Sequence, residues 1–276
     1  MSKIDEVLQC LPMDVYQSLD AYSRSDLMLV KKSPFHLKAK RESLYAGDEK
    51  ESAAMLLGEL VHCLVLEPDE LLNRYIGAIN VDRRTKAGKE LYAEFLKEAD
   101  GRIVVDQDMF EKAAHMATNV IGQKIPESAL KGCLIERSLA WRDDESGLTF
   151  KCRPDAYNPD NGVVVDLKTT KDASYRGMQG SSARYGYFLQ AAMIREALLF
   201  HGLKFSKYLL ICVESSAPYV YRPLIIGEAA LDSGLNEFNY LKRKLATCIH
   251  ENKFEHYPLA ELLYPSWAEQ DFIEEY

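Results

Sequence analysis

A stretch of alternating apolar and polar residues, Leu134 to Thr170, dominates the pattern of this chain. Two segments within it, Asp143–Gly147 (DDESG) and Asn158–Gly162 (NPDNG), are rich in residues that favour turn dihedrals. The runs that these turns separate are short and rich in Val, Leu and aromatic residues, as strands are. The pattern therefore predicts three consecutive strands joined by two tight turns.

Apolar segments on either side of this stretch predict the remaining elements. Residues 51–67 are apolar almost all round, so they predict a buried helix that ends before Pro68. The glycine- and serine-rich residues 172–182 predict an irregular connection. Further helices are expected at 26–32, from Pro34 onward, at 90–99, 110–125, 183–201 and 228–252, and further strands at 205–214 and 219–226. Together they predict an α/β fold, a mixed central sheet of about five strands flanked by helices, with added N-terminal helices.

Length and composition bound the class of protein. The chain has 276 residues, 47% of them hydrophobic and 28% charged, as in a globular domain. We expect a single domain over residues 1–276, with an N-terminal helical arm (1–50), a core (51–252) and an acidic aromatic tail (253–276). No apolar run is long enough for a membrane span, and no signal peptide is evident. The six cysteines lack a CxxC pair, which argues against zinc or iron–sulfur ligation and indicates a reducing, cytoplasmic compartment.

Candidate catalytic and metal-binding residues lie on the last two predicted strands. Asp166 and Lys168 are two residues apart, so an extended backbone points both side chains to one face. On the preceding strand Lys151, Arg153 and Asp155 are expected to share a face, and a hairpin can then bring Asp155 to Asp166. Buried carboxylates need partners, and magnesium prefers such oxygen ligands. The alternative is a solvated face that carries a weak ion pair.

Three further positions can complete such a site. Gly58 and His62 lie four apart on one face of the buried helix, where the glycine indicates close packing against another element. His62 is read either as a satisfied core histidine or as a metal ligand. Glu136, at the start of the first strand, is either an exposed strand residue or an added carboxylate. Gln190 needs a polar partner on a mostly apolar helix face, and Tyr187 can lie beside it.

Basic residues are unevenly distributed along a chain with net charge −8. Residues 24–41 contain six Lys or Arg and one acid, whereas residues 251–276 contain seven acids and one lysine. A basic face and an acidic remainder can therefore coexist in one molecule. The candidate DNA-binding residues are Arg24, Lys31, Lys32, Arg83, Arg84 and Lys86.

The order of these motifs resembles the RecB-like branch of the PD-(D/E)xK nucleases. The motifs are GxxxH (Gly58–His62), Glu136, Pro154-Asp155, the DLK segment Asp166–Lys168, and the helix with Tyr187 and Gln190. Three segments, SRSDLMLVKKSPFHLKAKRE, LLGELVHCLVLEP and VDRRTKAGKE, resemble the nuclease domain of RecE-type exonucleases (exonuclease VIII) and their phage relatives. The likeness extends roughly from Ala21 to His250. Ile194 departs from the QxxxY pattern, because it stands where that pattern has its tyrosine.

The resemblance implies a metal-dependent exonuclease that digests double-stranded DNA ends 5′ to 3′ and leaves 3′ single-stranded tails for an annealing protein in recombination. Its implied cofactor is Mg²⁺, with Mn²⁺ as a substitute, and its implied assembly is a ring-shaped homo-oligomer, expected to be a tetramer. The residues that it places around the metal are His62, Asp155, Asp166 and Leu167. Lys168 would orient the attacking water, Glu136 would add a carboxylate, and Tyr187 and Gln190 would complete the helix motif.

Other functions remain open from the sequence. The same core could serve an endonuclease, which linear and covalently closed DNA substrates would distinguish. A nuclease of the Cas4 type is disfavoured because its four cluster cysteines are missing. A non-catalytic DNA-binding or assembly protein is a third reading, against which the intact Asp155, Asp166 and Lys168 argue.

Overall fold

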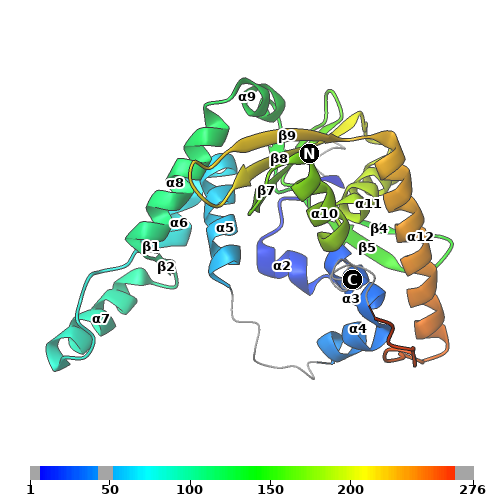
Figure 1. The fold of residues 1–276 in the computed structure, drawn as a ribbon, viewed down its shortest axis with the longest axis horizontal. Helices are drawn as coiled ribbons and strands as arrows, with labels where there is room; N and C mark the ends of the chain where they lie inside the picture. The colour runs from blue at the N-terminus through cyan, green and yellow to red at the C-terminus, as the bar shows by residue number, and fades with distance from the viewer. Residues whose placement is uncertain (1–6, 43–51, 265–276) are drawn as a thin grey trace, which may run out of the picture.

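The computed structural model describes residues 7–42 and 52–264. Its centre is one mixed sheet (Figure 1). From edge to edge the strands are β3 (Leu134–Ile135), β6 (Ala156–Asn158), β7 (Val163–Thr170), β8 (Lys207–Glu214) and β9 (Tyr221–Ile226). β7 pairs parallel with β8 and antiparallel with β6, and the two edge strands pair antiparallel with their neighbours. The predicted α/β fold with about five strands is confirmed.

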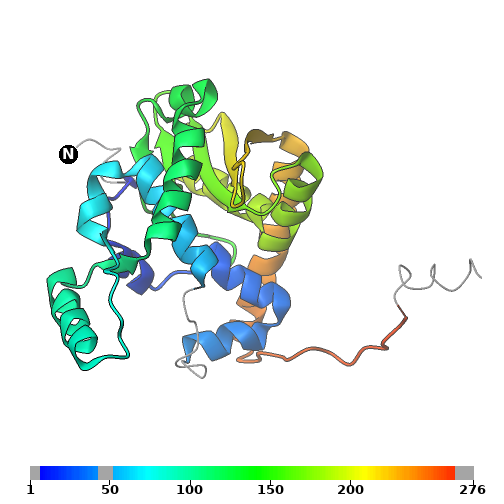
Figure 2. The same ribbon diagram turned by 60° about the vertical axis from the view of Figure 1, so that its left-hand side comes forward.

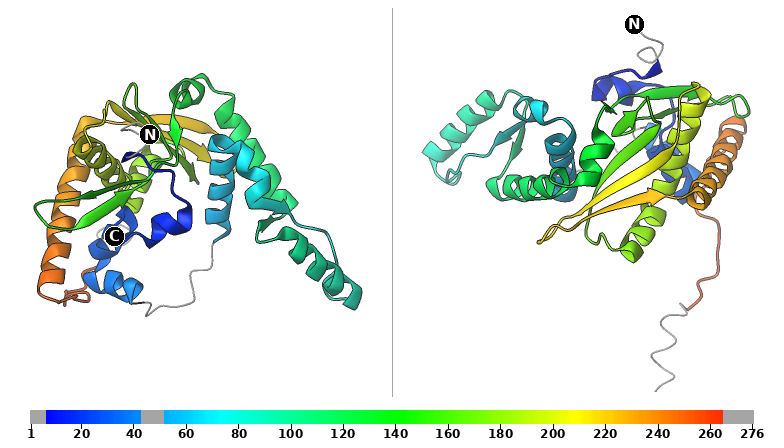
Figure 3. Two further views of the ribbon diagram at one scale, coloured as in Figure 1. Left: turned by 180° about the vertical axis from the view of Figure 1, so that it is seen from behind. Right: turned by 90° about the horizontal axis from the view of Figure 1, so that it is seen from above.

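Helices cover both faces of this sheet. On one face lie α5 (Ala53–Leu66) and α8 (Gln107–Ile121), and on the other lie α11 (Tyr187–Phe200) and α12 (Glu228–His250) (Figures 1 and 3). Successive residues of a strand point to opposite sides, so Val165 and Leu167 of β7 are buried with α5 and α8. Val164 is buried with α11 and α12. Asp166 and Lys168 consequently point to the α11 side.

The prediction of three consecutive strands over 134–170 is wrong, because the first is divided into β3, in the central sheet, and β4 (Leu139–Arg142), with Glu136 between them. β4 and β5 (Thr149–Cys152) form a hairpin of their own outside the central sheet. The predicted turn at 143–147 joins them. The expectation that Lys151, Arg153 and Asp155 share one strand face is wrong, because β5 ends at Cys152 and β6 begins at Ala156. Pro154 lies in this break and has no backbone N–H to donate to a strand ladder.

The predicted connection at 172–182 is wrong, because most of it belongs to α10 (Tyr175–Tyr185). The Ser174 side chain caps this helix by accepting from a backbone N–H in its first turn, as serine does at helix starts. This local cap outweighs the weak helix propensity of the glycine and serine residues in the segment.

The predicted single helix at 183–201 is divided at Gly186. Its φ of 70° lies in the left-handed region, which glycine adopts without steric cost. A Cβ at this position would also lie only 2.7 Å from Sδ of Met28 in α3 (Arg24–Lys32). The break between α10 and α11 is therefore packed directly against α3.

Two N-terminal helices, α3 and α4 (Pro34–Arg41), belong to the same core as α11 and α12. α3 begins with a capping box, in which Ser23 and Asp26 each accept a backbone hydrogen bond from the other. Leu27 and Val30 of α3 are fully buried in this core. α2 (Met13–Ser18) precedes α3, and α4 follows it with proline at a first-turn position, as the sequence predicts.

A small unit projects beside α5 and α8 (Figures 1 and 2). In it the parallel strands β1 (Tyr75–Gly77) and β2 (Ile103–Val105) are connected through α7 (Lys86–Ala99). The helix is predicted, but strands of three residues are too short to show a hydrophobic period. The remaining short helices are η1 (Pro68–Glu70), α6 (Leu71–Arg74) and α9 (Lys124–Leu130).

The chain leaves α12 and runs along α4 before extending away from the body (Figure 2). Phe35 of α4 donates its N–H to the Glu255 carbonyl and stacks on His256 with ring centroids 3.8 Å apart. Residues 265–276 of the predicted tail lie outside the described residues. Within the described residues, no helix has the length and apolarity that crossing a membrane requires.

Two glycines test how tightly the helix layer is packed. A Cβ on Gly234 of α12 would lie 2.2 Å from the Phe188 carbonyl oxygen of α11, whereas a Cβ on Gly180 of α10 would meet nothing within 4 Å. Gly234→Ala should therefore lower the free energy of unfolding by about 1–3 kcal/mol through overpacking. Gly180→Ala should raise it by about 0.5–1 kcal/mol, because alanine favours the helix. Urea denaturation measures both, and equal effects would contradict this packing.

Candidate active site

A buried charge pair on β7 forms the centre of the candidate site. Asp166 is 0% exposed, and Lys168 Nζ lies 2.6 Å from its Oδ2. Gln190 Nε2 of α11 donates to Oδ1 of the same carboxylate at 2.8 Å. Burial raises the pKa of Asp166. Burial opposes the charged form of Lys168, but Asp166 and Asp155 outweigh it and raise the Lys168 pKa, so this side chain remains an ammonium ion.

Tyr187, the first residue of α11, holds Lys168 from the other side. The Lys168 ammonium lies 5.1 Å from the centre of the Tyr187 ring, within range of a cation–π interaction. Burial raises the pKa of the Tyr187 hydroxyl, so the phenol stays neutral. The structure thus brings Tyr187 and Gln190 to the Asp166–Lys168 pair, while Ile194 is buried in the core.

Asp155 and His62 converge on the backbone of Leu167. The Leu167 N–H donates to Asp155 Oδ2 at 2.8 Å, and the Leu167 carbonyl accepts from His62 Nε2 at 2.7 Å. His62 lies on α5, which approaches β7 closely because Gly58 leaves room for Thr169: a Cβ on Gly58 would lie 3.2 Å from Thr169 Oγ1. The expected close packing of Gly58 is confirmed, with β7 as the neighbouring element.

Glu136 joins this group from the loop after β3. It adopts a φ of 49°, which is uncommon for a residue with a side chain, and its N–H donates to the Asp155 carbonyl at 3.0 Å. Strained positions of this kind cluster at functional sites. Burial and the neighbouring Asp155 carboxylate raise the pKa of Glu136 to about 8.

The donor set of His62, Glu136 and Asp155 fits a divalent cation. One potential ligand atom from each lies within 4.8 Å of the others. His62 Nε2 donates to a carbonyl, so a neutral ring presents a lone pair on Nδ1 to Asp155 Oδ2, 3.6 Å away. Two facing acceptors repel each other unless a cation or a proton lies between them. Oxygen ligands with one imidazole suit several divalent metals.

Two residues predicted as metal ligands have other partners in this arrangement. Both carboxylate oxygens of Asp166 face Lys168 and Gln190, and Asp166 is not part of the cluster just described. The Leu167 carbonyl is occupied by the His62 ring. Their ligation of a metal stays a prediction.

Part of the candidate site opens into a groove of about 1500 Å³. Its walls come from α5, the β1–β2 unit, α2, and the junction of α10 with α11. Five of the predicted site residues line it: His62, Glu136, Leu167, Lys168 and Tyr187.

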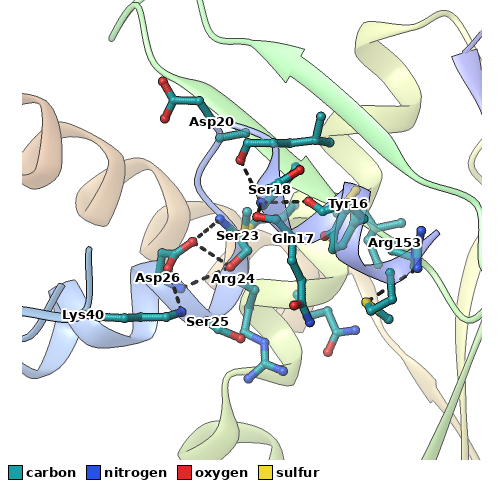
Figure 4. A pocket seen from close by; sticks show the side chains of 18 of the residues that line it. Tyr16, Gln17, Ser18, Asp20, Ser23, Arg24, Ser25, Asp26, Lys40 and Arg153 are labelled. Atoms are coloured by element: carbon teal, nitrogen blue, oxygen red, sulfur yellow. Dashed lines mark hydrogen bonds and ion pairs between the residues drawn. The ribbon is translucent and has the colours of Figure 1, made fainter. Parts of the chain in front are cut away.

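A second cavity of about 760 Å³ lies beneath the turn between α2 and α3 (Figure 4). It shares Met13, Arg24 and Arg153 with the groove. Asp26 and Lys40, which also line it, form an ion pair at 3.1 Å.

The predicted DNA-binding residues occupy two separate regions. Arg24 lines the groove, and Lys32 is exposed at the other end of the same helix. Lys31 pairs with Glu237 at 2.6 Å. The other three belong to residues 83–86, which lead into α7, and they contact local partners. Figure 1 shows α7 in the projecting unit, away from α3. Arg83 stacks over Tyr92, Arg84 pairs with Asp82, and Lys86 lies 4.0 Å from Glu90.

Sequence reasoning did not identify the role of Lys151. Its side chain is buried, and Nζ donates to the backbone carbonyls of Tyr16, Gln17 and Leu19. A lysine at this position fixes the C-terminal end of α2 beside the site, because cations satisfy the free carbonyls of a helix end. The only signal in the sequence is a lysine between the apolar Phe150 and Cys152.

Comparisons with known proteins report on the fold and the family of this chain. A crystal structure of a Eubacterium rectale protein, provisionally named an exonuclease, matches with a TM-score of 0.63 at 16% identity, over 97% of this chain and 100% of that chain. A phage-related exonuclease from Haemophilus somnus 129PT matches with a TM-score of 0.32 at 13% identity, over 87% of this chain and 100% of that one. A search of curated proteins found no match.

The first of these likenesses shows a shared fold. The model of a family described as a PDDEXK-like domain of unknown function (DUF3799) matches residues 23–258, which include both halves of the motif, Pro154-Asp155 and Asp166–Lys168. The chain therefore belongs to this PDDEXK-like family, DUF3799, and has the core of the PD-(D/E)xK nucleases.

Proposed function

We propose that this chain is a Mg²⁺-dependent exodeoxyribonuclease that digests linear double-stranded DNA from its ends, 5′ to 3′, and leaves 3′ single-stranded tails. The observation that carries the proposal is the proximity of the His62–Glu136–Asp155 cluster to the buried Asp166–Lys168 pair, with His62, Glu136 and Lys168 lining one groove. Hydrolysis of a phosphodiester requires charge neutralisation and an oriented water, and this groove contains groups suited to both. The direction of digestion and the annealing partner rest on the resemblance to RecE-type exonucleases.

Each side chain has a distinct task in this mechanism. A divalent ion bound by His62, Glu136 and Asp155 would neutralise phosphate charge and lower the pKa of a bound water. Lys168, held by Asp166 and Tyr187, presents an ammonium to the attacking water and the phosphate. The water oxygen joins phosphorus as the P–O3′ bond breaks, and the proton that water loses balances the one that the 3′ oxygen gains.

Assembly can reconcile DNA binding with a net charge of −8. A ring-shaped homo-oligomer, expected to be a tetramer, would turn several copies of the groove and Arg24 towards a central duplex. Closed symmetry raises the retention of a DNA end without a more basic chain. Sedimentation at working concentration tests this part of the proposal, and a fully processive monomer would contradict it.

Linear and covalently closed DNA of the same sequence test the reaction itself. In Mg²⁺ the wild-type protein should digest the linear duplex and spare the closed circle, because an exonuclease needs an end. A time course on duplex labelled at the 5′ or the 3′ end reports the direction. Cleavage of the circle would instead indicate an endonuclease, and no Mg²⁺-dependent cleavage of either substrate would indicate a non-catalytic DNA-binding protein.

Lys168 and Lys171 form a matched pair of lysines on and just beyond β7. Lys168→Ala should lower the digestion rate by about 10²–10³-fold, as expected when a preorganised charge is removed from a transition state. Lys168→Arg should also lose DNA digestion, because a planar guanidinium does not replace a compact ammonium. Lys171 is exposed, so Lys171→Ala should digest DNA like the wild type. An equal loss of digestion rate in both alanine variants would show that Lys168 has no special role in the reaction.

Cation binding can be measured without DNA. Mg²⁺ or Mn²⁺ should raise the melting temperature of the wild type. At a cation concentration 100 times the dissociation constant, the free energy of unfolding should rise by about 2.7 kcal/mol. Asp155→Asn should lose this stabilisation because it removes a cluster carboxylate. Asp160→Asn, an exposed aspartate in the β6–β7 turn, is the control and should retain it. A full cation response in Asp155→Asn would exclude Asp155 as a ligand.

A further inference from the structure

An exposed aromatic ring lies at the rim of the groove and has no part in the mechanism above. Tyr185, the last residue of α10, is 51% exposed and lines the groove together with Lys168 and Tyr187. Other tyrosines are as exposed, such as Tyr175 at 61% and Tyr240 at 59%, but they line neither the groove nor the second cavity. Tyr185 therefore differs from these tyrosines in its place at the groove and not in its exposed fraction.

The backbone that carries this ring is held firmly. Arg24 Nη1 donates to the Tyr185 carbonyl at 2.9 Å. The next residue, Gly186, adopts a left-handed conformation against Met28. Both Arg24 and Met28 belong to α3, so one helix holds the backbone at the Tyr185 carbonyl and at Gly186. Because the backbone is held, only the two side-chain torsions of Tyr185 remain to be ordered when a ligand stacks on its ring, which keeps the entropic cost of binding low.

The ring is also close to the catalytic groups. Its centroid lies 6.0 Å from that of Tyr187, whose centroid lies 5.1 Å from Lys168 Nζ. Along a stacked strand these two contacts span at most about three nucleotide steps of 3.4 Å. A strand whose scissile phosphate lies at Lys168 can therefore reach the Tyr185 ring with a nucleotide at most about three steps away.

The lining of the groove matches both parts of a nucleotide. Five cationic side chains line the groove, Arg24, Arg74, Arg102, Arg153 and Lys168, and so do five carboxylates, Glu59, Glu67, Glu70, Asp100 and Glu136. Arg74 pairs with Glu67 at 2.7 Å, and Arg153 donates to Ser138 Oγ and to the Leu11 carbonyl, so we assign the phosphate contacts to Arg24 and Lys168. Two exposed apolar side chains from separate helices, Met13 and Met55, line the groove as well. Charged groups together with accessible aromatic and apolar surface are typical of sites that bind single-stranded nucleic acid.

We infer that Tyr185 is a stacking site for an unpaired nucleobase of the strand being cleaved, with Arg24 beside it as the phosphate contact. The inference rests on the proposed nuclease function and adds a preference within it: the groove binds the strand in its unpaired form. Any base offers a π face, so this contact is independent of sequence. The terminal base pairs of a duplex must consequently open before the strand enters.

Binding of a short single-stranded oligonucleotide tests this directly, with Ca²⁺ in place of Mg²⁺ to limit hydrolysis. Fluorescence anisotropy gives the affinity, and a 2-aminopurine base in the oligonucleotide reports stacking. Tyr185→Ala should weaken binding by about 5- to 100-fold, the effect of losing one base–aromatic stack. Tyr185→Leu, which retains apolar bulk without a π face, should weaken it similarly and lose the stacking signal. Tyr185→Trp should bind at least as tightly as the wild type.

Tyr175→Ala is the matched control, because it removes an exposed tyrosine from the same helix outside the groove. It should leave affinity and the 2-aminopurine signal unchanged. If Tyr185→Leu binds like the wild type while the protein still digests DNA, the stacking site is overturned and the nuclease function stands. If the wild type binds no DNA and cleaves none, both proposals fail.

Discussion

The buried pair of Asp166 and Lys168 constrains the whole site. A carboxylate that is 0% exposed and an ammonium 2.6 Å away are stable in the core only if each retains its partners. Removal of one member of such a pair typically costs about 3–5 kcal/mol, because the other charge is left uncompensated. The surroundings meet this demand with Gln190 on one side and Tyr187 on the other, both from α11. The packing of α11 over β7 therefore determines whether the charge pair keeps its partners.

The backbone of Leu167, between these two charges, links them to the second half of the site. Its N–H donates to Asp155 and its carbonyl accepts from His62, so one peptide segment orients a carboxylate and an imidazole at once. This requires α5 to approach the sheet closely, which Gly58 permits. The two faces of β7 therefore act together: side chains on the α11 face hold charge, and the backbone positions the residues that can bind a cation.

Several features follow from local rules that operate along the chain. The DDESG and NPDNG turns, the helix start at Pro34 and the alternation on β7 depend on neighbouring residues, and they form as the sequence predicts. Other predictions fail at single residues whose effect the hydrophobic pattern does not show. Gly186 divides a helix by a left-handed conformation, the Ser174 cap begins a helix where a connection was expected, and the strand expected to carry Arg153 and Asp155 breaks at Pro154.

The sequence by itself determined the class of the fold and most candidate residues of the site, because strand alternation and turn composition already place Asp155 near Asp166. Only the tertiary structure decided which of these groups meet. His62 reaches Asp155 across 93 positions of chain, with Nδ1 3.6 Å from the carboxylate, and Glu136 joins them through an uncommon backbone conformation. The tertiary structure also placed Tyr185 at the rim of the groove. Such contacts depend on how helices pack on the sheet, and neither periodicity nor spacing along the chain encodes that packing.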